Sequence, residues 1–158
     1  MLKDFLTAAD CKNLNETDLI DFGKFIYIYE QHIRNNFGMF KWNAETFTQF
    51  CKSNKIQPKG NRIIREQHNH FWFSANKTKD KHSNDVAHHF LRHIRNAYAH
   101  GNIKVVKEGK TKSKYYLIQD FDVKKNKSSE QTMQGKIRDV LLWEMINILY
   151  NTIKTTQK

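Results

Sequence analysis

The sequence predicts an all-α helical bundle with one small β-hairpin inserted before the last helix. Residues that break helices are scarce, with 1 Pro and 6 Gly in 158 residues, so long helices are permitted. Apolar residues recur at three- and four-residue steps in several long segments, which is the spacing of one helix face. Between about residues 103 and 120, this period gives way to a run of β-forming residues. A chain of this length is expected to form a single domain, residues 1–158.

Three helices are expected in the first half of the chain, at residues 18–37, 44–53 and 61–75. Asn15 or Thr17 can cap the first helix, and Gly38 follows it as a stop. Asn43 can cap the second helix in the same way. The third helix is less regular, because its aromatic run at residues 71–73 also fits an extended strand.

In the second half we expect a two-faced helix, a hairpin, a polar loop and a final helix, at about residues 84–100, 103–120, 124–134 and 133–152. The hairpin turns at residues 108–110, where a glycine lies between two charged residues. Trp143 and Ile146 widen the apolar face of the final helix beyond one stripe. This width fits a helix that packs on two sides or against a second subunit.

The chain is strongly basic, with 27 Lys and Arg against 16 Asp and Glu and a formal net charge of +11. A charge of this size favours a polyanionic partner such as nucleic acid. A solvated basic surface in a chain rich in Lys and Asn gives the same charge, so composition alone does not decide between the two.

The two cysteines, Cys11 and Cys51, do not indicate a disulfide framework, and the apolar spacing around Cys51 predicts a buried thiol. No signal-peptide pattern follows Met1, and no run of 18 apolar residues is present. We therefore expect a cytoplasmic protein.

The segment from Asp85 to His100 separates into two faces when it is drawn as a helix of about 100° per residue. One face is apolar and is expected to join the core: Val86, Ala87, Phe90, Leu91, Ile94, Ala97 and Tyr98. The other face is rich in cationic and hydrogen-bonding residues: Asp85, His88, His89, Arg92, His93, Arg95, Asn96, Ala99 and His100. A solvated helix face normally carries Glu, Lys and Gln, so this composition predicts a surface suited to phosphate.

The residue types on this face fit the cleavage of RNA by its own 2′-hydroxyl. That reaction needs a base, an acid and positive charge at the phosphate, and it needs no metal or other cofactor. Histidine suits the first two roles and arginine the third. Arg95 and His100 point about 140° apart on an ideal helix, so they do not converge as neighbours. Either Gly101 unwinds the helix end, or the long arginine bridges the gap, or a twofold dimer brings two copies of the face together.

The sequence Arg95, Asn96, Ala97-Tyr98-Ala99, His100 resembles the catalytic motif of the HEPN superfamily, an arginine followed after four to six residues by a histidine. The longer run at residues 93–103 looks like a plasmid-borne bacterial HEPN subfamily, and the resemblance is strong over about residues 86–118. It implies a helical bundle and a homodimer with a composite cleft. It also implies metal-independent cleavage of RNA, in a toxin or antiphage effector with an antitoxin protein as a further partner.

The resemblance also assigns roles to the motif residues. His100 would be the general acid or base, Arg95 would stabilise the scissile phosphate, and Asn96 would orient the site. The helix wheel adds His89, Arg92 and His93 as further phosphate contacts. The hairpin lysines extend this basic surface or form a charged solvent loop: Lys104, Lys107, Lys110, Lys112 and Lys114.

Three other interpretations of the motif stay open. The motif could simply end a helix, since a cation followed by Gly101 is a common C-terminal pattern. The domain could bind RNA or dimerise without catalysis. His89 and His93 have a spacing that can chelate zinc from one helix turn, although no acid or cysteine pair accompanies them.

Overall fold

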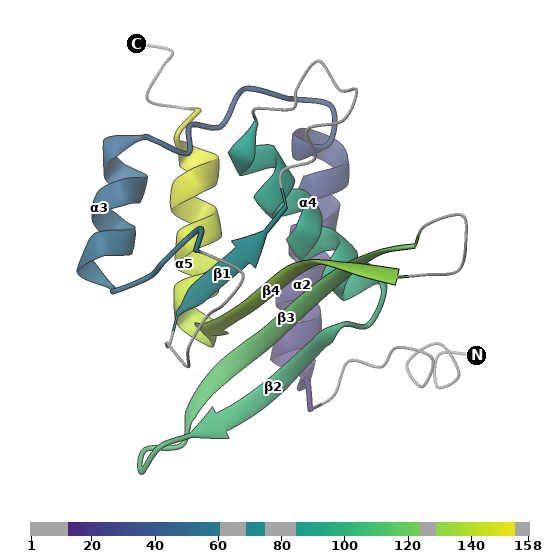
Figure 1. Cartoon of the computed structure of the whole chain (residues 1–158), viewed down its shortest axis with the longest axis vertical. Helices are drawn as coiled ribbons and strands as arrows, with labels where there is room; N and C mark the ends of the chain where they lie inside the picture. The colour runs from purple at the N-terminus through teal and green to yellow at the C-terminus, as the bar shows by residue number, and fades with distance from the viewer. Residues whose placement is uncertain (1–12, 61–68, 75–84, 124–128, 154–158) are drawn as a thin grey trace.

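The computed structural model of the chain describes residues 13–60, 69–74, 85–123 and 129–153. The elements in chain order are α2 (Glu16–Ile28), the π-helix η1 (Tyr29–Ile33), α3 (Glu45–Ser53), β1 (His70–Phe73), α4 (Val86–Ala99), β2 (Ile103–Glu108), β3 (Ser113–Val123), β4 (Ser129–Arg138) and α5 (Asp139–Asn151). Helices α2, α4 and α5 lie on one side of a four-stranded sheet, behind it in Figure 1. The protein is therefore an α+β fold, and the predicted all-α bundle is wrong.

The sheet has the strand order β1-β4-β3-β2, and every neighbouring pair is antiparallel. The predicted hairpin is confirmed as β2 and β3, which pair from Ile103↔Ile118 to Glu108↔Ser113. The expected polar loop at 124–134 is wrong over its second half, because β4 begins at Ser129. The third expected helix is also wrong at residues 70–73, which form β1, while residues 61–68 lie outside the described part.

The last helix does not begin at about residue 133, as expected, because residues 133–138 belong to strand β4 and have the period-two pattern of a strand. Met133 and Ile137 are fully buried, and Gly135 lies between them on the same face. A Cβ on Gly135 would lie 2.1 Å from Cδ1 of Phe71, whose ring lies over the glycine. The glycine is needed for the close approach of this ring, and α5 starts only at Asp139.

Helix α2 begins two residues earlier than expected and is capped by Asn15, as predicted. Asn15 forms a capping box with Asp18, in which each side chain accepts a hydrogen bond from the other residue's backbone N–H. Asp18 also accepts from Lys114 and Tyr116 of β3, so the helix start is tied to the sheet. Burial raises the pKa of this carboxyl, but the hydrogen bonds from Lys114 and Tyr116 outweigh burial and lower it.

The expected continuous helix to residue 37 is interrupted by η1, in which the Arg34 N–H donates to the Tyr29 carbonyl, five residues back, at 2.9 Å. Helix α3 forms as expected, but its N-cap is Ala44, which makes no side-chain cap, so the cap predicted at Asn43 is wrong. Cys51 on α3 is buried, as predicted, and burial raises the pKa of its thiol to about 11. Cys11 lies outside the described residues.

The hydrophobic core lies between the sheet and the helices and contains residues from every element of the described chain. The predicted apolar face of α4 is confirmed at its centre, where Phe90, Leu91 and Ile94 are fully buried. Phe90 packs edge-on against Phe71 of β1, with ring centroids 5.1 Å apart. In the described part of the chain, no helix has both the length and the apolar character needed to cross a membrane.

We predict that Gly135→Ala lowers the free energy of unfolding by about 1–3 kcal/mol, because Phe71 is fully buried and cannot yield to the added methyl group. Gly23→Ala is the matched control. Gly23 is an exposed residue within α2 and has open space around its Cα, so this change should raise the free energy of unfolding by about 0.5–1 kcal/mol. Urea denaturation followed by circular dichroism measures both, and equal effects of the two changes would contradict the assigned strand register.

Candidate functional site

Helix α4, which carries the Arg-Asn-x-x-x-His motif, is capped at both ends. At its N-terminus Asp85 accepts a hydrogen bond from the His88 N–H at 3.0 Å and another from the Gly38 N–H, so α4 is fixed to the chain that follows η1. At its C-terminus Gly101 has a φ of +71°, and Asn102 N–H donates to the Ala97 carbonyl at 2.7 Å. This is a Schellman motif, for which glycine is the usual residue.

The left-handed residue of the Schellman motif, Gly101, follows His100, and α4 runs to Ala99 with His100 as its C-cap. The His100 N–H donates to the Asn96 carbonyl at 2.9 Å, which is the ordinary helical hydrogen bond. Gly101 therefore ends the helix and does not unwind the motif. The side chains of Arg95 and His100 still point about 140° apart within one chain.

The polar face of α4 is not an open surface along its whole length. His88, His89 and His93 are 2%, 5% and 1% exposed, whereas Arg95 and Asn96 are half-buried and His100 is exposed. The sequence pattern predicted one continuous stripe of histidines, and the structure divides it into an interior part and an exposed end. The division arises because β3 and Ser74 lie against the middle of α4.

His93 bridges α4 to two other parts of the chain. Its Nδ1 lies 2.7 Å from Oδ2 of Asp120 on β3, and its Nε2 lies 2.9 Å from the carbonyl oxygen of Ser74. The carbonyl oxygen of Ser74 can only accept, so Nε2 donates to it, and Nδ1 shares a hydrogen bond with the carboxyl group of Asp120. The pair is almost fully buried, with His93 at 1% and Asp120 at 2% side-chain exposure. With both nitrogens engaged inside the protein, His93 holds α4 on the sheet, and this geometry does not support the predicted phosphate contact.

Asp120 is positioned by an irregularity in the sheet. The β3–β4 register shifts between Asp120 and Phe121, and the Phe121 N–H donates to Oδ1 of Asp120 at 3.0 Å. The second carboxylate oxygen, Oδ2, accepts from His93 and lies 3.5 Å from Nδ2 of Asn96. Sequence reasoning missed Asp120, although an acid at a core-facing position of a strand, two residues after the buried Ile118, was a detectable signal.

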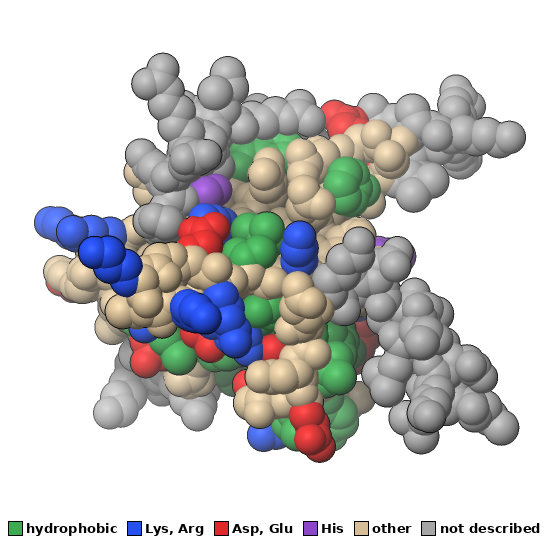
Figure 2. Space-filling model, turned by 90° about the horizontal axis from the view of Figure 1, so that it is seen from below, with side chains coloured by type: hydrophobic (Ala, Val, Ile, Leu, Met, Phe, Trp, Pro, Cys, Tyr) green, Lys and Arg blue, Asp and Glu red, His purple; other side chains and the backbone are tan. Residues whose placement is uncertain are grey.

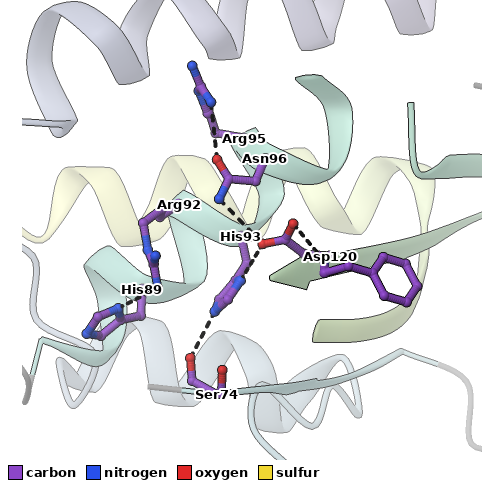
Figure 3. Close-up of polar contacts among 8 residues, drawn as sticks. Ser74, His89, Arg92, His93, Arg95, Asn96 and Asp120 are labelled. Atoms are coloured by element: carbon purple, nitrogen blue, oxygen red, sulfur yellow. Dashed lines mark hydrogen bonds and ion pairs between the residues drawn. The ribbon is translucent and has the colours of Figure 1, made fainter. Parts of the chain in front are cut away.

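Arg95 is held at three points next to this buried pair. Its Nε and Nη2 both lie 3.1 Å from Oε1 of Glu30, and its Nη1 donates to Oδ1 of Asn96 at 3.2 Å. Oε2 of Glu30 in turn accepts from Arg34 at 2.8 Å. Figure 3 shows the contacts running from Arg95 through Asn96 and Asp120 to His93 and Ser74. The motif arginine is therefore connected to the interior by hydrogen bonds.

Two guanidinium groups meet at Glu30 beside α4, and we call Arg34 and Arg95 the arginine cluster. Arg92 is not part of it, because its Nη2 lies against His89 and its side chain points away from Arg95 in Figure 3. Burial raises the pKa of Tyr29, while the positive charges of Arg92, Arg95 and Arg34 act in the opposite direction. The hydrogen bond from Arg34 is the main reason that the pKa of Glu30 is lowered, and Arg95 adds to it. Sequence reasoning missed Glu30 and Arg34, because the ion pair with Arg95 spans 65 residues.

His89 is buried inside the protein, next to Arg92. Its Nδ1 faces Nη2 of Arg92 at 3.1 Å, and the guanidinium can only donate. Burial lowers the pKa of His89 to about 4, and the charges of Arg92 and His93 add to this effect. At neutral pH the ring is therefore uncharged, so a role for His89 as a cationic phosphate contact lacks support.

His100 and Lys104 are exposed at the end of α4 and on β2, respectively. Among the described residues, no hydrogen bond or ion pair joins either side chain to the Arg95–Asn96 contacts. Lys107, Lys110 and Lys112 of the hairpin are exposed too. The view in Figure 2, from below, shows Lys and Arg side chains projecting from the surface of the molecule. The structure thus brings Arg95 and Asn96 together, directs Arg92 to His89, and leaves His100 and Lys104 as separate surface groups.

The ring nitrogens that a zinc ion would need are already engaged in hydrogen bonds within the protein. Nδ1 of His89 accepts from Arg92, and both nitrogens of His93 are hydrogen-bonded to oxygen atoms. Within the described ranges, no three His, Cys, Asp or Glu side chains come close enough together to hold a metal ion.

Comparison with known proteins identifies no relative. No protein-family model matches the chain, and no match was found among curated proteins or solved structures. The HEPN resemblance therefore depends on the motif residues alone, and the observed sheet differs from the all-α bundle that this resemblance implies.

We predict that His89 makes the protein less stable in mild acid. Because its folded pKa of about 4 lies below the ordinary value of 6.5, the unfolded chain binds a proton that the folded chain does not between these two values. The contribution of His89 is complete above pH 6.5 and falls as the pH drops towards 4, by of order 3 kcal/mol in total. Urea denaturation of wild type and His89→Gln across this range should show a smaller loss in the variant.

His32 provides the matched control, since it is an exposed histidine on η1. His32→Gln should keep the wild-type dependence on pH. Parallel curves for wild type and His89→Gln would show that the His89 ring titrates normally in the folded protein.

Proposed function

We propose that the protein is a metal-independent endoribonuclease whose active site is built on the exposed end of α4. One observation carries the proposal. The motif arginine is fixed by Asn96 and Glu30, five residues before an exposed imidazole on the same regular helix. A guanidinium with a defined orientation can stabilise charge on a phosphate, and an exposed imidazole can transfer protons.

In this proposal each motif residue has one task. The 2′-hydroxyl oxygen of RNA attacks the adjacent phosphorus, the bond from phosphorus to the 5′-oxygen breaks, and a 2′,3′-cyclic phosphate forms. His100 takes the proton of the 2′-hydroxyl group and then delivers it to the leaving 5′-oxygen. Arg95 donates hydrogen bonds to the phosphate oxygens as negative charge develops on them. Asn96 is a positioning residue, since it holds Arg95 and is itself near Asp120.

A homodimer fits the direction of the two side chains better than a single chain. The helix is regular through His100, so one copy presents Arg95 and His100 in directions about 140° apart. A twofold axis beside the end of α4 would bring the arginine of one copy near the histidine of the other. RNA in the cytoplasm is the proposed substrate. The role as a toxin or antiphage effector, with an antitoxin as partner, rests on the HEPN resemblance.

We predict that the purified protein cleaves single-stranded RNA in the presence of EDTA and leaves 2′,3′-cyclic phosphate ends. His100→Ala and Arg95→Ala should each lower the cleavage rate by at least about 100-fold, because each removes a group that acts in the transition state. His32→Ala is the control, as it removes an exposed histidine that lies on η1 instead of α4. Gel electrophoresis of a labelled RNA measures all four rates.

Unchanged cleavage by both His100→Ala and Arg95→Ala would overturn the proposed active site. Retention of RNA in a gel shift without any shortening, in wild type and variants alike, would instead identify a binding module.

A further inference from the structure

Glu30 neutralises only part of the positive charge that surrounds it. The two guanidinium groups of the arginine cluster share this carboxylate, with Arg34 on Oε2 and Arg95 on Oε1. The side chains of Arg34, Arg95 and Glu30 are 60%, 31% and 28% exposed. The cluster is therefore a surface site with an excess of positive charge, within reach of an anionic ligand.

The guanidinium groups have donors to spare. Each carries five N–H donors, and Arg34 uses one nitrogen for Glu30. Arg95 uses Nε and Nη2 for one oxygen of Glu30 and Nη1 for Asn96. A guanidinium can bind two phosphate oxygens in parallel, and one carboxylate shared by two arginines leaves part of this capacity unused.

The contacts around Arg95 differ in how easily they can break. Exposed ion pairs such as Glu30–Arg34 contribute little to stability, so exchanging the carboxylate for another anion costs little. The His93–Asp120 pair is buried and lies next to Asn96, which holds Nη1 of Arg95. Arg95 would keep this support after Glu30 moves away. Glu30 is therefore the replaceable partner, and Asn96 is the permanent one.

We propose that the arginine cluster is a binding site for a phosphate group of RNA, in which Glu30 is an internal counter-ion that the phosphate displaces. The π-helix η1 serves this arrangement, because it contributes Glu30 and leads directly into Arg34 at its C-cap. The choice of RNA as the ligand rests on the proposed function. Glu30 competes with RNA for the two guanidinium groups, and Arg34 extends the site beyond the motif.

The test is binding of a fluorescent, single-stranded 2′-O-methyl RNA, which lacks the attacking hydroxyl, measured by anisotropy at several salt concentrations. Glu30→Gln should bind about threefold to tenfold more tightly than wild type, with a salt dependence steeper by up to about one released counter-ion. Arg34→Gln should bind about threefold to tenfold more weakly, with a slope shallower by about one.

Glu144→Gln is the matched control, because it makes the same change in net charge at an exposed position on α5. It should alter affinity by less than about twofold. Equal affinities of Glu30→Gln and Glu144→Gln would overturn the role of Glu30, and an unchanged affinity in Arg34→Gln would overturn the site. Circular dichroism checks that the variants fold.

The outcome separates this site from the proposed catalysis, since the probe cannot be cleaved. Tighter binding by Glu30→Gln in a protein that does not cleave ordinary RNA would support the phosphate site and contradict the proposed nuclease activity. Cleavage of ordinary RNA, with equal affinities of Glu30→Gln and Glu144→Gln for the probe, would support the nuclease activity and contradict the role of Glu30. Absence of binding in wild type and Glu30→Gln alike would contradict the site.

Discussion

The buried pair of His93 and Asp120 is the interaction on which the candidate site depends. It joins α4 to β3 at 2.7 Å and, through the second ring nitrogen, to the carbonyl of Ser74 after β1. Burying two charges is costly, and the cost is offset only when the geometry is good and the remaining polar atoms are satisfied. Here the ring uses both nitrogens, and both carboxylate oxygens of Asp120 have donors close by. The pair therefore fixes the middle of α4 against the sheet and supports Asn96.

From this buried pair the chemistry changes along a single helix face. His93 and His89 are interior residues, the first hydrogen-bonded at both nitrogens and the second uncharged at neutral pH because its pKa is lowered to about 4. One turn later, Asn96 accepts a hydrogen bond from Arg95, and His100 at the end of the helix is exposed to solvent. A rigid interior below a polar, exposed end is the arrangement that pre-organised catalytic groups require. At this end Arg95 directs Nε and Nη2 to Oε1 of the Glu30 carboxylate, so its guanidinium is oriented by an anionic group.

The sequence was informative where structure depends on local contacts. The apolar face of α4, the Asn15 cap and the β2–β3 hairpin follow from residues a few positions apart, and each was predicted. Strand β4 was missed although β3, its partner from Val123↔Ser129 onwards, lies just before it in the chain, because residues 129–132 are polar and Gly135 has no side chain to mark the buried face. The burial of His93 was missed because its partner Asp120 is 27 residues away. The all-α fold was inferred from helix spacing and the HEPN motif, neither of which reports on a sheet.

A double-mutant cycle on His93 and Asp120 tests the central claim most directly, with unfolding by urea as the measurement. We expect His93→Leu and Asp120→Leu each to lower the free energy of unfolding by about 3–5 kcal/mol, because each leaves the other member of the buried pair without its partner. The double variant should lose clearly less than the sum of the two, since no unpaired member of the pair then remains. Additive losses, within about 0.5 kcal/mol, would show that the two side chains do not interact and would contradict the account.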